Sequence, residues 1–250
     1  MRERLIDEYN AHLLADAGLG EALFARLKAA QRARRLLYGD REIGVSLRPH
    51  FLSREQYGRL TRASELVSSA LDKVAAALLA DPAQLERVGL TDAERRLALV
   101  EPGYSGTAVN TRLDAFVHGR EVKFVEMNAE NPSSLSDQSG LNEVLFEVGA
   151  MREAGARYRL RQFDPVAGLL GALLETYAEW GGREVPNVAI VDWEGLPTSH
   201  EFELLRAYFA SRGVPTIVCA PDELEYTRGR LRRGDFRIDV VYKRVIIHEF

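Results

Sequence analysis

The feature that most constrains the fold is a succession of apolar, amphipathic and apolar segments late in the chain. Asn187–Trp193 and Val214–Cys219 have the pattern of short buried strands, and Ser199–Ser211 between them has the spacing of an amphipathic helix. Two buried strands joined through a helix form a β-α-β unit, whose strands run parallel within one sheet. Ile238–Tyr242 is predicted to add a further strand to that sheet.

The chain up to about Leu99 has a different character. Apolar residues recur there at steps of three and four, which indicates helices. Ser53 and Gln56 have the spacing of a capping box at the start of one helix, and Thr91 and Glu94 repeat that spacing at the start of another. We expect these helices to serve mainly as packing surfaces.

The helical period stops in the middle of the chain. Val109–Val117 and Glu121–Asn128 are rich in β-favouring residues and flank a turn at 118–120, which predicts a hairpin. A helix is expected to follow to about Val148, and another to span Val166–Trp180. Neither G-x-G-x-x-G nor G-x-x-x-x-G-K-[ST] occurs, so a dinucleotide site has little support.

Composition excludes several classes of protein. A formal net charge of -4 and a pI near 5.8 argue against a general nucleic-acid binder. No apolar run reaches the roughly 18 residues that cross a bilayer, and the N-terminus offers no apolar secretory segment. Cys219 is the only cysteine, which excludes an intramolecular disulfide. We therefore expect a cytoplasmic protein with no nucleic-acid or membrane partner.

Two polar pairs in the predicted hairpin carry the strongest functional signal. Alternate residues of a strand share a face, so Arg112 lies with Asp114, and Glu126 lies with Asn128. A three-residue loop would place Arg112 opposite Glu126 and Asn110 opposite Asn128, and both pairs would share one face. A two-residue loop would send the pairs to opposite faces, because a one-residue shift of register inverts every side chain.

If the pairs meet, they suit a magnesium ion that holds phosphate oxygens. Asp114, Glu126 and Asn128 supply hard oxygen ligands, and Mg²⁺ usually takes one or two carboxylates and completes its shell with water and phosphate. Arg112 would add a two-pronged grip on a phosphate. The alternative is an ordinary solvated face with an ion pair between Arg112 and Glu126.

These residues resemble those of a known family. Arg112-x-Asp114, followed after a turn by Lys123-Phe-Val-Glu126-x-Asn128-Ala-Glu130-x-Pro132, is similar to the magnesium-site hairpin of glutathionylspermidine synthetases and related circularly permuted ATP-grasp proteins. Asn187–Trp193, Glu201–Gly213 and Asp239–Arg244 are similar to the Rossmann-like pre-ATP-grasp unit of that family. The resemblance covers about Tyr104 to Phe250.

The resemblance implies an activity and a division of the chain. It implies that Asp114, Glu126 and Asn128 bind magnesium and that Arg112 is the catalytic residue that contacts the transferring phosphate. The cofactors would be ATP and Mg²⁺, and the partners a small carboxylate and a small amine that are joined through an acyl phosphate. The predicted fold class is α/β (α+β), with a helical region over 1–100, the metal-site hairpin and a helix over 101–160, and the Rossmann-like unit over 161–250.

Two further pairs of residues are candidates for binding. Ser133 and Ser134, at the start of a predicted helix, are expected either to donate to a cofactor phosphate or to cap the helix. Lys243 and Arg244, at the end of a predicted strand, are expected either to bind a substrate carboxylate or to form a solvated basic edge.

Members of the family are considerably longer than 250 residues. Their adenine-binding residues come from a segment that would follow Phe250, so we expect this chain to be part of a longer ligase with an incomplete ATP-grasp fold. Apolar surface exposed by such a truncation predicts association into homo-oligomers. The alternative is a non-catalytic binding or interaction module that has kept the fold.

Overall fold

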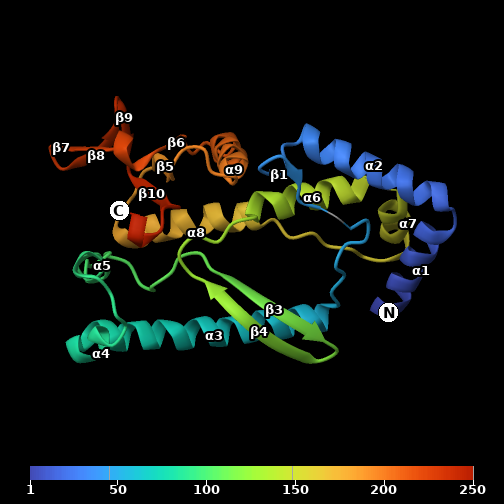
Figure 1. The fold of residues 1–250 in the computed structure, drawn as a ribbon, viewed down its shortest axis with the longest axis horizontal. Coiled ribbons are helices and arrows are strands. Elements are labelled where there is room, and N and C mark those ends of the chain that lie inside the picture. Colours follow the sequence, from blue (N-terminus) through green and yellow to red (C-terminus); the bar gives the residue numbers. More distant parts are fainter. Residues whose placement is uncertain (45, 148, 250) are drawn as a thin grey trace. The chain divides into compact units, whose positions relative to one another are not determined.

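The computed structural model describes residues 1–44, 46–147 and 149–249 (Figure 1). The chain has a mixed α+β fold, as the sequence predicts. The helices are α1 (Arg2–Leu14), α2 (Ala17–Ala33), α3 (Arg54–Ala80), α4 (Pro82–Glu86), α5 (Asp92–Ala98), α6 (Leu135–Glu147), α7 (Gly149–Arg157), α8 (Pro165–Trp180) and α9 (Ser199–Ser211). The strands are β1 (Leu37–Tyr38), β2 (Arg41–Glu42), β3 (Arg112–His118), β4 (Glu121–Asn128), β5 (Val188–Val191), β6 (Thr216–Cys219), β7 (Glu225–Thr227), β8 (Arg230–Arg233), β9 (Phe236–Ile238) and β10 (Val240–Lys243).

The predicted β-α-β unit is confirmed. Strand β5 pairs parallel with β6 on one side and with β10 on the other. All four residues of β5 are buried, which explains why this strand reads as an uninterrupted apolar run. Gly213 follows α9 with a φ of +80°, a left-handed conformation that glycine adopts without steric cost and that turns the chain toward β6.

The contacts divide the chain into two compact units, and each unit contains segments that are distant in sequence. The first unit consists of Met1–Arg54, Ser133–Gly168 and Glu194–Tyr208. The second unit consists of Glu55–Pro132, Leu169–Trp193 and Phe209–Phe250. The domain boundaries near residues 100 and 160 that were drawn on the sequence stay predictions.

The first unit is built from helices that pack through two apolar clusters. One cluster joins α1 to α7 and contains Leu5, Tyr9, Phe51, Met151 and Ala154. The other joins the end of α2 to α6 and contains Leu27, Leu36, Val144 and Leu145. Gly140 allows this close approach, because a Cβ atom at that position would lie 2.5 Å from a methyl group of Leu36. The two clusters thus join α7 to α1 and α6 to the end of α2.

The second unit has its core on the parallel sheet. Ala189, Val191, Cys219, Ile238 and Val245 form a buried cluster there. Burial raises the pKa of the Cys219 thiol, which keeps this lone cysteine protonated and unreactive. The side chains of β8 and β9 that face the sheet, Leu231 and Phe236, pack against the same cluster.

The two helix starts predicted in the N-terminal part agree with the structure. Helix α3 begins at Arg54, directly after Ser53. Helix α5 has the predicted capping box, in which the Thr91 Oγ1 atom accepts from the Glu94 amide at 3.3 Å and the Glu94 carboxylate accepts from the Thr91 amide at 2.8 Å. The short β1–β2 pair was not predicted from the helical pattern.

Two other regions differ from the sequence prediction. The helix expected to run to about Val148 is α6, which is described to Glu147, and Val148 itself lies outside the described residues; helix α7, from Gly149, was not predicted. The three-stranded antiparallel sheet β7–β8–β9 was not predicted. Its strands have three or four residues each, too few for an alternating pattern to emerge. Within the described residues, no helix is both long and apolar enough to cross a lipid bilayer.

Candidate functional site

The predicted hairpin exists, with a shorter loop than expected. Strands β3 and β4 pair antiparallel, and His118 faces Glu121 across a two-residue loop. Of the two loop lengths that the sequence left open, the structure has the two-residue loop, and the pairing that a three-residue loop would give is absent. Arg112 lies opposite Asn128, Asp114 lies opposite Glu126, and Asn110 precedes the start of β3.

A β-bulge in β4 brings the two polar pairs to the same face. Ala115 pairs with Phe124 and Asp114 pairs with Glu126, so Val125 is an extra residue with no partner in β3. The extra residue reverses the alternation of side chains along the rest of β4. Without it, the two-residue loop would have sent Glu126 to the face opposite Asp114. The two polar pairs therefore share one face, which the sequence left open, and the bulge rather than the loop length brings this about.

The four polar side chains, which we call the hairpin quartet, form a connected network. The Arg112 guanidinium donates to both carboxylate oxygens of Asp114, with Nε to Oδ1 at 2.9 Å and Nη2 to Oδ2 at 3.4 Å. Its Nη2 atom also lies 3.9 Å from Oε1 of Glu126, and Nδ2 of Asn128 donates to the same Glu126 oxygen at 3.0 Å. Arg112, Asp114 and Asn128 are half-buried and Glu126 is exposed, so solvent and a ligand can reach the network.

The opposite face of the hairpin explains why the quartet is accessible. That face carries apolar, half-buried side chains: Leu113, Ala115, Val117, Val122, Phe124 and Met127. At the loop end, the Arg120 guanidinium lies 3.6 Å from the carboxylate of Glu55 at the start of α3. Burial of the apolar face fixes the orientation of the strands and leaves the quartet on the accessible side.

The donor set of the quartet fits magnesium. Two carboxylates and an amide oxygen on one accessible face match a cation that takes few protein ligands and keeps several waters. Within the described residues, no group of three or more His, Cys, Asp or Glu side chains could hold a metal ion, so a transition-metal centre has no support there. The roles of Asp114, Glu126 and Asn128 as ligands stay predictions.

Ser133 and Ser134 lie at the start of α6, where the Glu201 carboxylate already accepts a hydrogen bond from the backbone. The Leu135 amide donates to Oε1 of Glu201 at 2.7 Å. Ser134 has a φ of +75°, its carbonyl accepts from the Gln138 amide at 3.1 Å, and its side chain hydrogen-bonds to Asp137. Both serines therefore stand beside an occupied helix N-terminus, and their binding of a cofactor phosphate stays a prediction.

Asp137 and Glu201 form a buried acid pair that sequence reasoning missed. Burial, with the Glu201 carboxylate as a second cause, raises the pKa of the Asp137 carboxyl to about 6. Glu201 itself is buried. No periodicity or motif pointed to this pair, because α6 and α9 approach each other only in the folded chain.

Lys243 and Arg244 hold the segment that leaves the hairpin. The Lys243 ammonium donates to Glu130 at 2.5 Å, and the Ile247 amide donates to the same Glu130 oxygen at 2.7 Å. Arg244 is buried, and its guanidinium donates to the carbonyl of Pro132. The backbone carbonyl of Arg244 accepts from Asn131 Nδ2 at 3.0 Å. These contacts tie Glu130–Pro132 to the end of β10, and binding of a substrate carboxylate by either cation stays a prediction.

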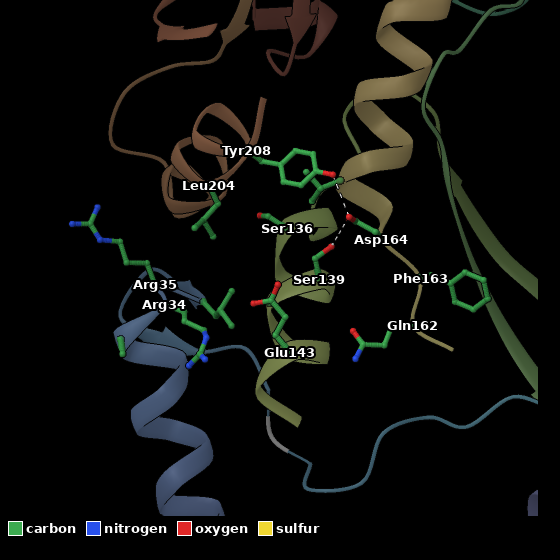
Figure 2. Close-up of a pocket in the computed structure, with 14 residues that line it drawn as sticks. Arg34, Arg35, Ser136, Ser139, Glu143, Gln162, Phe163, Asp164, Leu204 and Tyr208 are labelled. Atoms are coloured by element: carbon green, nitrogen blue, oxygen red, sulfur yellow. Dashed lines mark hydrogen bonds between the residues drawn. The ribbon is translucent and has the colours of Figure 1, made fainter. Parts of the chain in front are cut away.

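The first unit contains a cavity of about 540 Å³ (Figure 2). Its walls come from the end of α2 and the residues after it, from α6, from 162–166 and from α9, and they mix apolar with polar and charged side chains. Asp164 accepts from Ser139 and from Tyr208, each at 3.3 Å, which joins three wall segments. The buried Ser136 hydroxyl also lines the cavity and has no hydrogen-bond partner among the described residues. The volume is within the usual range for small-molecule sites, roughly 300 to 1,000 Å³.

Comparison with known proteins gives a likeness of fold. No protein-family model matches the sequence, and no curated protein sequence matches it. Among solved structures, the chain is similar to a glutathione synthetase-like effector from Globodera pallida in its apo form, with a TM-score of 0.61 and 14% sequence identity. The match covers 92% of this chain and 58% of that protein, so the chain spans little more than half of its structural neighbour.

Proposed function

We propose that the chain is part of a Mg²⁺- and ATP-dependent ligase that joins a small carboxylate to a small amine, with a distant relationship to the circularly permuted ATP-grasp proteins. The observation that carries this proposal is the hairpin quartet. A bulge in β4 places one guanidinium and three oxygen-bearing side chains on a single accessible face. The fold shared with a glutathione synthetase-like protein supports the same class.

Within this proposal, the quartet divides into two roles. Asp114, Glu126 and Asn128 would hold the magnesium ion, which when bound supplies positive charge beside the phosphate oxygens. Arg112 would hold the transferring phosphate, since its planar guanidinium can donate two parallel hydrogen bonds. In the structure, Arg112 donates both of these hydrogen bonds to Asp114.

The reaction needs positioning and charge neutralisation more than proton transfer in its first step. An oxygen of the substrate carboxylate bonds to the terminal phosphorus of ATP as the bond to ADP breaks. The amine nitrogen then attacks the acyl carbon, inorganic phosphate leaves with the bonding electrons, and the nitrogen loses a proton to solvent. Arg112 and the charged ligands counter the negative charge that gathers on the phosphoryl oxygens.

Calorimetric titration of ATP into the chain, with and without MgCl₂, tests the proposal. We expect Mg²⁺-dependent binding in the range of about 1 μM to 1 mM that is usual for enzyme substrates. Asp114→Ala and Glu126→Ala should each weaken it at least about tenfold, the lower bound for loss of a metal-site residue. Glu121→Gln, on the same face of the hairpin but outside the quartet, is the matched control and should bind like the parent chain.

A non-catalytic binding module is the second candidate, because Arg112 satisfies both oxygens of Asp114 without a metal. Absence of any heat with Mg²⁺ and ATP would favour that module. If the Asp114→Ala and Glu126→Ala variants both still give the binding heat of the parent chain, the nucleotide binds elsewhere. That result would overturn the assignment of the quartet.

A further inference from the structure

The cavity of the first unit has one side that is rich in oxygen atoms and one side that is apolar. Figure 2 shows the polar groups of Asp164, Ser139 and Tyr208 together, with Leu204 on the other side of Ser136. All of these residues belong to the first unit, so the cavity is formed within one compact part of the chain. A polar side next to an apolar side suits a ligand with a polar end and an apolar body.

Asp164 lies at the centre of the polar side. Its Oδ1 atom accepts from the Ser139 hydroxyl at 3.3 Å and from the Ala167 amide at 3.1 Å, and its Oδ2 atom accepts from the Tyr208 hydroxyl at 3.3 Å. The bond from Ala167 caps the start of α8 and fixes the orientation of the carboxylate. Within residues 1–44, 46–147 and 149–249, no Lys, Arg or His side chain forms a salt bridge with Asp164.

The hydroxyl groups beside Asp164 have already used their donors. A Ser or Tyr hydroxyl carries one hydrogen and two lone pairs. Ser139 and Tyr208 both give that hydrogen to Asp164, because an ionised carboxylate only accepts. The lone pairs of Ser139 still face the cavity side of α6. This end of the cavity therefore offers acceptors to a ligand and few donors.

Ser136 provides an independent observation. It lies three residues before Ser139 on α6, so both side chains are on one face of the helix, and both line the cavity. Ser136 is only 6% exposed, and its hydroxyl has no hydrogen-bond partner among the residues that the structure describes. A buried hydroxyl without a partner costs free energy, which a hydrogen bond from a ligand would recover.

The arginines that line the cavity do not neutralise this end. Arg34 forms a salt bridge with Glu147, at 2.5 Å. Arg35 is exposed, and Figure 2 shows its side chain extending away from Asp164. Glu143, a second acid of the lining, forms no salt bridge with any described residue. The charge that remains in the cavity is negative.

The wall segments as a whole give the same sign. They contain four arginines and six acidic residues, a net charge of about −2, counted over 33–36, 135–147, 161–166 and 199–208. This count includes the acids and arginines that already pair with each other. The cavity therefore favours a cation over an anion.

The chemistry of the polar side selects the kind of cation. No group of three or more His, Cys, Asp or Glu side chains in the described part of the chain could hold a metal ion, so a metal is not favoured. A primary ammonium group carries three donors and no acceptor. Those three donors match three acceptors within one turn of α6 and beside it, from Ser136, Ser139 and Asp164.

We propose that the cavity binds a small primary amine with an apolar body. The ammonium group donates to Asp164, Ser139 and Ser136, and the apolar body packs against Leu36 and Leu204 on the other side of the lining. The cavity belongs to the first unit and the hairpin quartet to the second, and this inference does not rest on the proposed function.

A titration of the full chain with three probes of equal length tests the charge of the ligand. The probes are n-hexylamine, n-hexanol and hexanoate at about pH 7, followed by ligand-observed NMR. We expect saturable binding of n-hexylamine with a Kd of about 1 mM or below, within reach of so small a ligand. The neutral and anionic probes should bind at least about tenfold more weakly, because neither can make three charge-assisted hydrogen bonds.

Two variants test the polar side. Asp164→Asn keeps the helix cap and removes the charge, and should weaken n-hexylamine binding at least about tenfold. Ser136→Ala should weaken it about threefold or more, while thermal unfolding shows a midpoint no lower than that of the parent, because an unpaired buried hydroxyl is removed. Glu21→Gln removes the same charge from an exposed position near the start of α2 and should leave binding unchanged.

Several results would overturn the proposal. Equal affinity for n-hexylamine and n-hexanol would show that only apolar contact drives binding. Tighter binding of hexanoate would make the cavity an anion site governed by its arginines. Absence of saturable n-hexylamine binding up to about 10 mM, parent affinity in either Asp164→Asn or Ser136→Ala, or an equal loss in Glu21→Gln, would also contradict it.

Discussion

The parallel sheet and the hairpin show how differently two regions of one chain encode their structure. Every residue of β5 is buried, and its register with β6 and β10 runs without interruption. The hairpin has one apolar and one polar face, and its register changes by one residue at Val125. A strand buried on both faces needs only apolar residues. In a strand with one polar face, the register of pairing decides which side chains point outward. The polar chemistry accordingly lies in the less buried region.

The largest expected effect is at the centre of the parallel sheet. Ile190 is fully buried, so Ile190→Ala should lower the free energy of unfolding by about 2 to 5 kcal/mol, through lost transfer energy and a residual cavity. Phe116→Ala is the matched change in the hairpin. Phe116 is 74% exposed, and its loss should change stability by no more than about 0.5 kcal/mol. Urea unfolding of both variants measures the contrast, and similar losses would refute it.

Arg244 connects the two regions and should come second. Its buried guanidinium donates to the Pro132 carbonyl and to the Tyr242 hydroxyl. Arg244→Met keeps the length of the side chain but removes these donors, and should cost about 2 to 3 kcal/mol, because buried acceptors lose charged partners. Lys243→Met removes a more exposed cation and should cost about 1 kcal/mol or less. Equal losses would show that the Arg244 contacts contribute little to stability.

Deletion of Val125 tests the bulge itself. The deletion leaves a regular two-residue hairpin in which Glu126 and Asn128 turn toward the apolar face. We expect a loss of about 1 to 2 kcal/mol in stability, typical of a disturbed core face, and loss of any Mg²⁺-dependent ATP binding. Val125→Ala keeps the extra residue and should keep that binding. A deletion variant that still binds ATP in a Mg²⁺-dependent manner would show that the common face is not required.

The sequence predicted the helices and strands that are marked by a hydrophobic period or by capping residues close to them in the chain. The β-α-β unit followed from its apolar runs, the start of α3 from Ser53, and the capping box of α5 from Thr91 and Glu94. The hairpin strands also followed, but their register did not. A bulge depends on how the strands pack and twist together, so the residue type at Val125 does not predict it.

The pair of acids at α6 was beyond prediction for a different reason. Asp137 and Glu201 are far apart in sequence, and a pKa depends on burial and on neighbours that only the fold supplies. The sheet β7–β8–β9 was also missed, because its strands are too short to show a period.

Asp137 gives the smallest effect and the one with a defined pH dependence. Its pKa is raised to about 6 in the folded chain from 3.8, so between these values the native state binds more protons than the unfolded state. The stability contributed by this group is therefore greatest below about pH 4, falls as the pH rises, and is lowest above about pH 6. Because the carboxyl is partly exposed, solvent screening reduces the penalty to about 1 kcal/mol.

Asp137→Asn removes the charge and isolates this contribution. The variant should be more stable than the parent chain by about 1 kcal/mol at about pH 7.5, and equal to it at about pH 4, where the parent carboxyl is already protonated. Glu143→Gln changes an exposed acid on the same helix and should shift stability equally at both pH values. Thermal unfolding of all three chains at the two pH values measures the difference. An Asp137→Asn effect that is the same at both would mean that Glu201 and burial do not hold a proton on Asp137, and the contrast between a structural acid pair in α6 and α9 and the accessible acids of the hairpin would disappear.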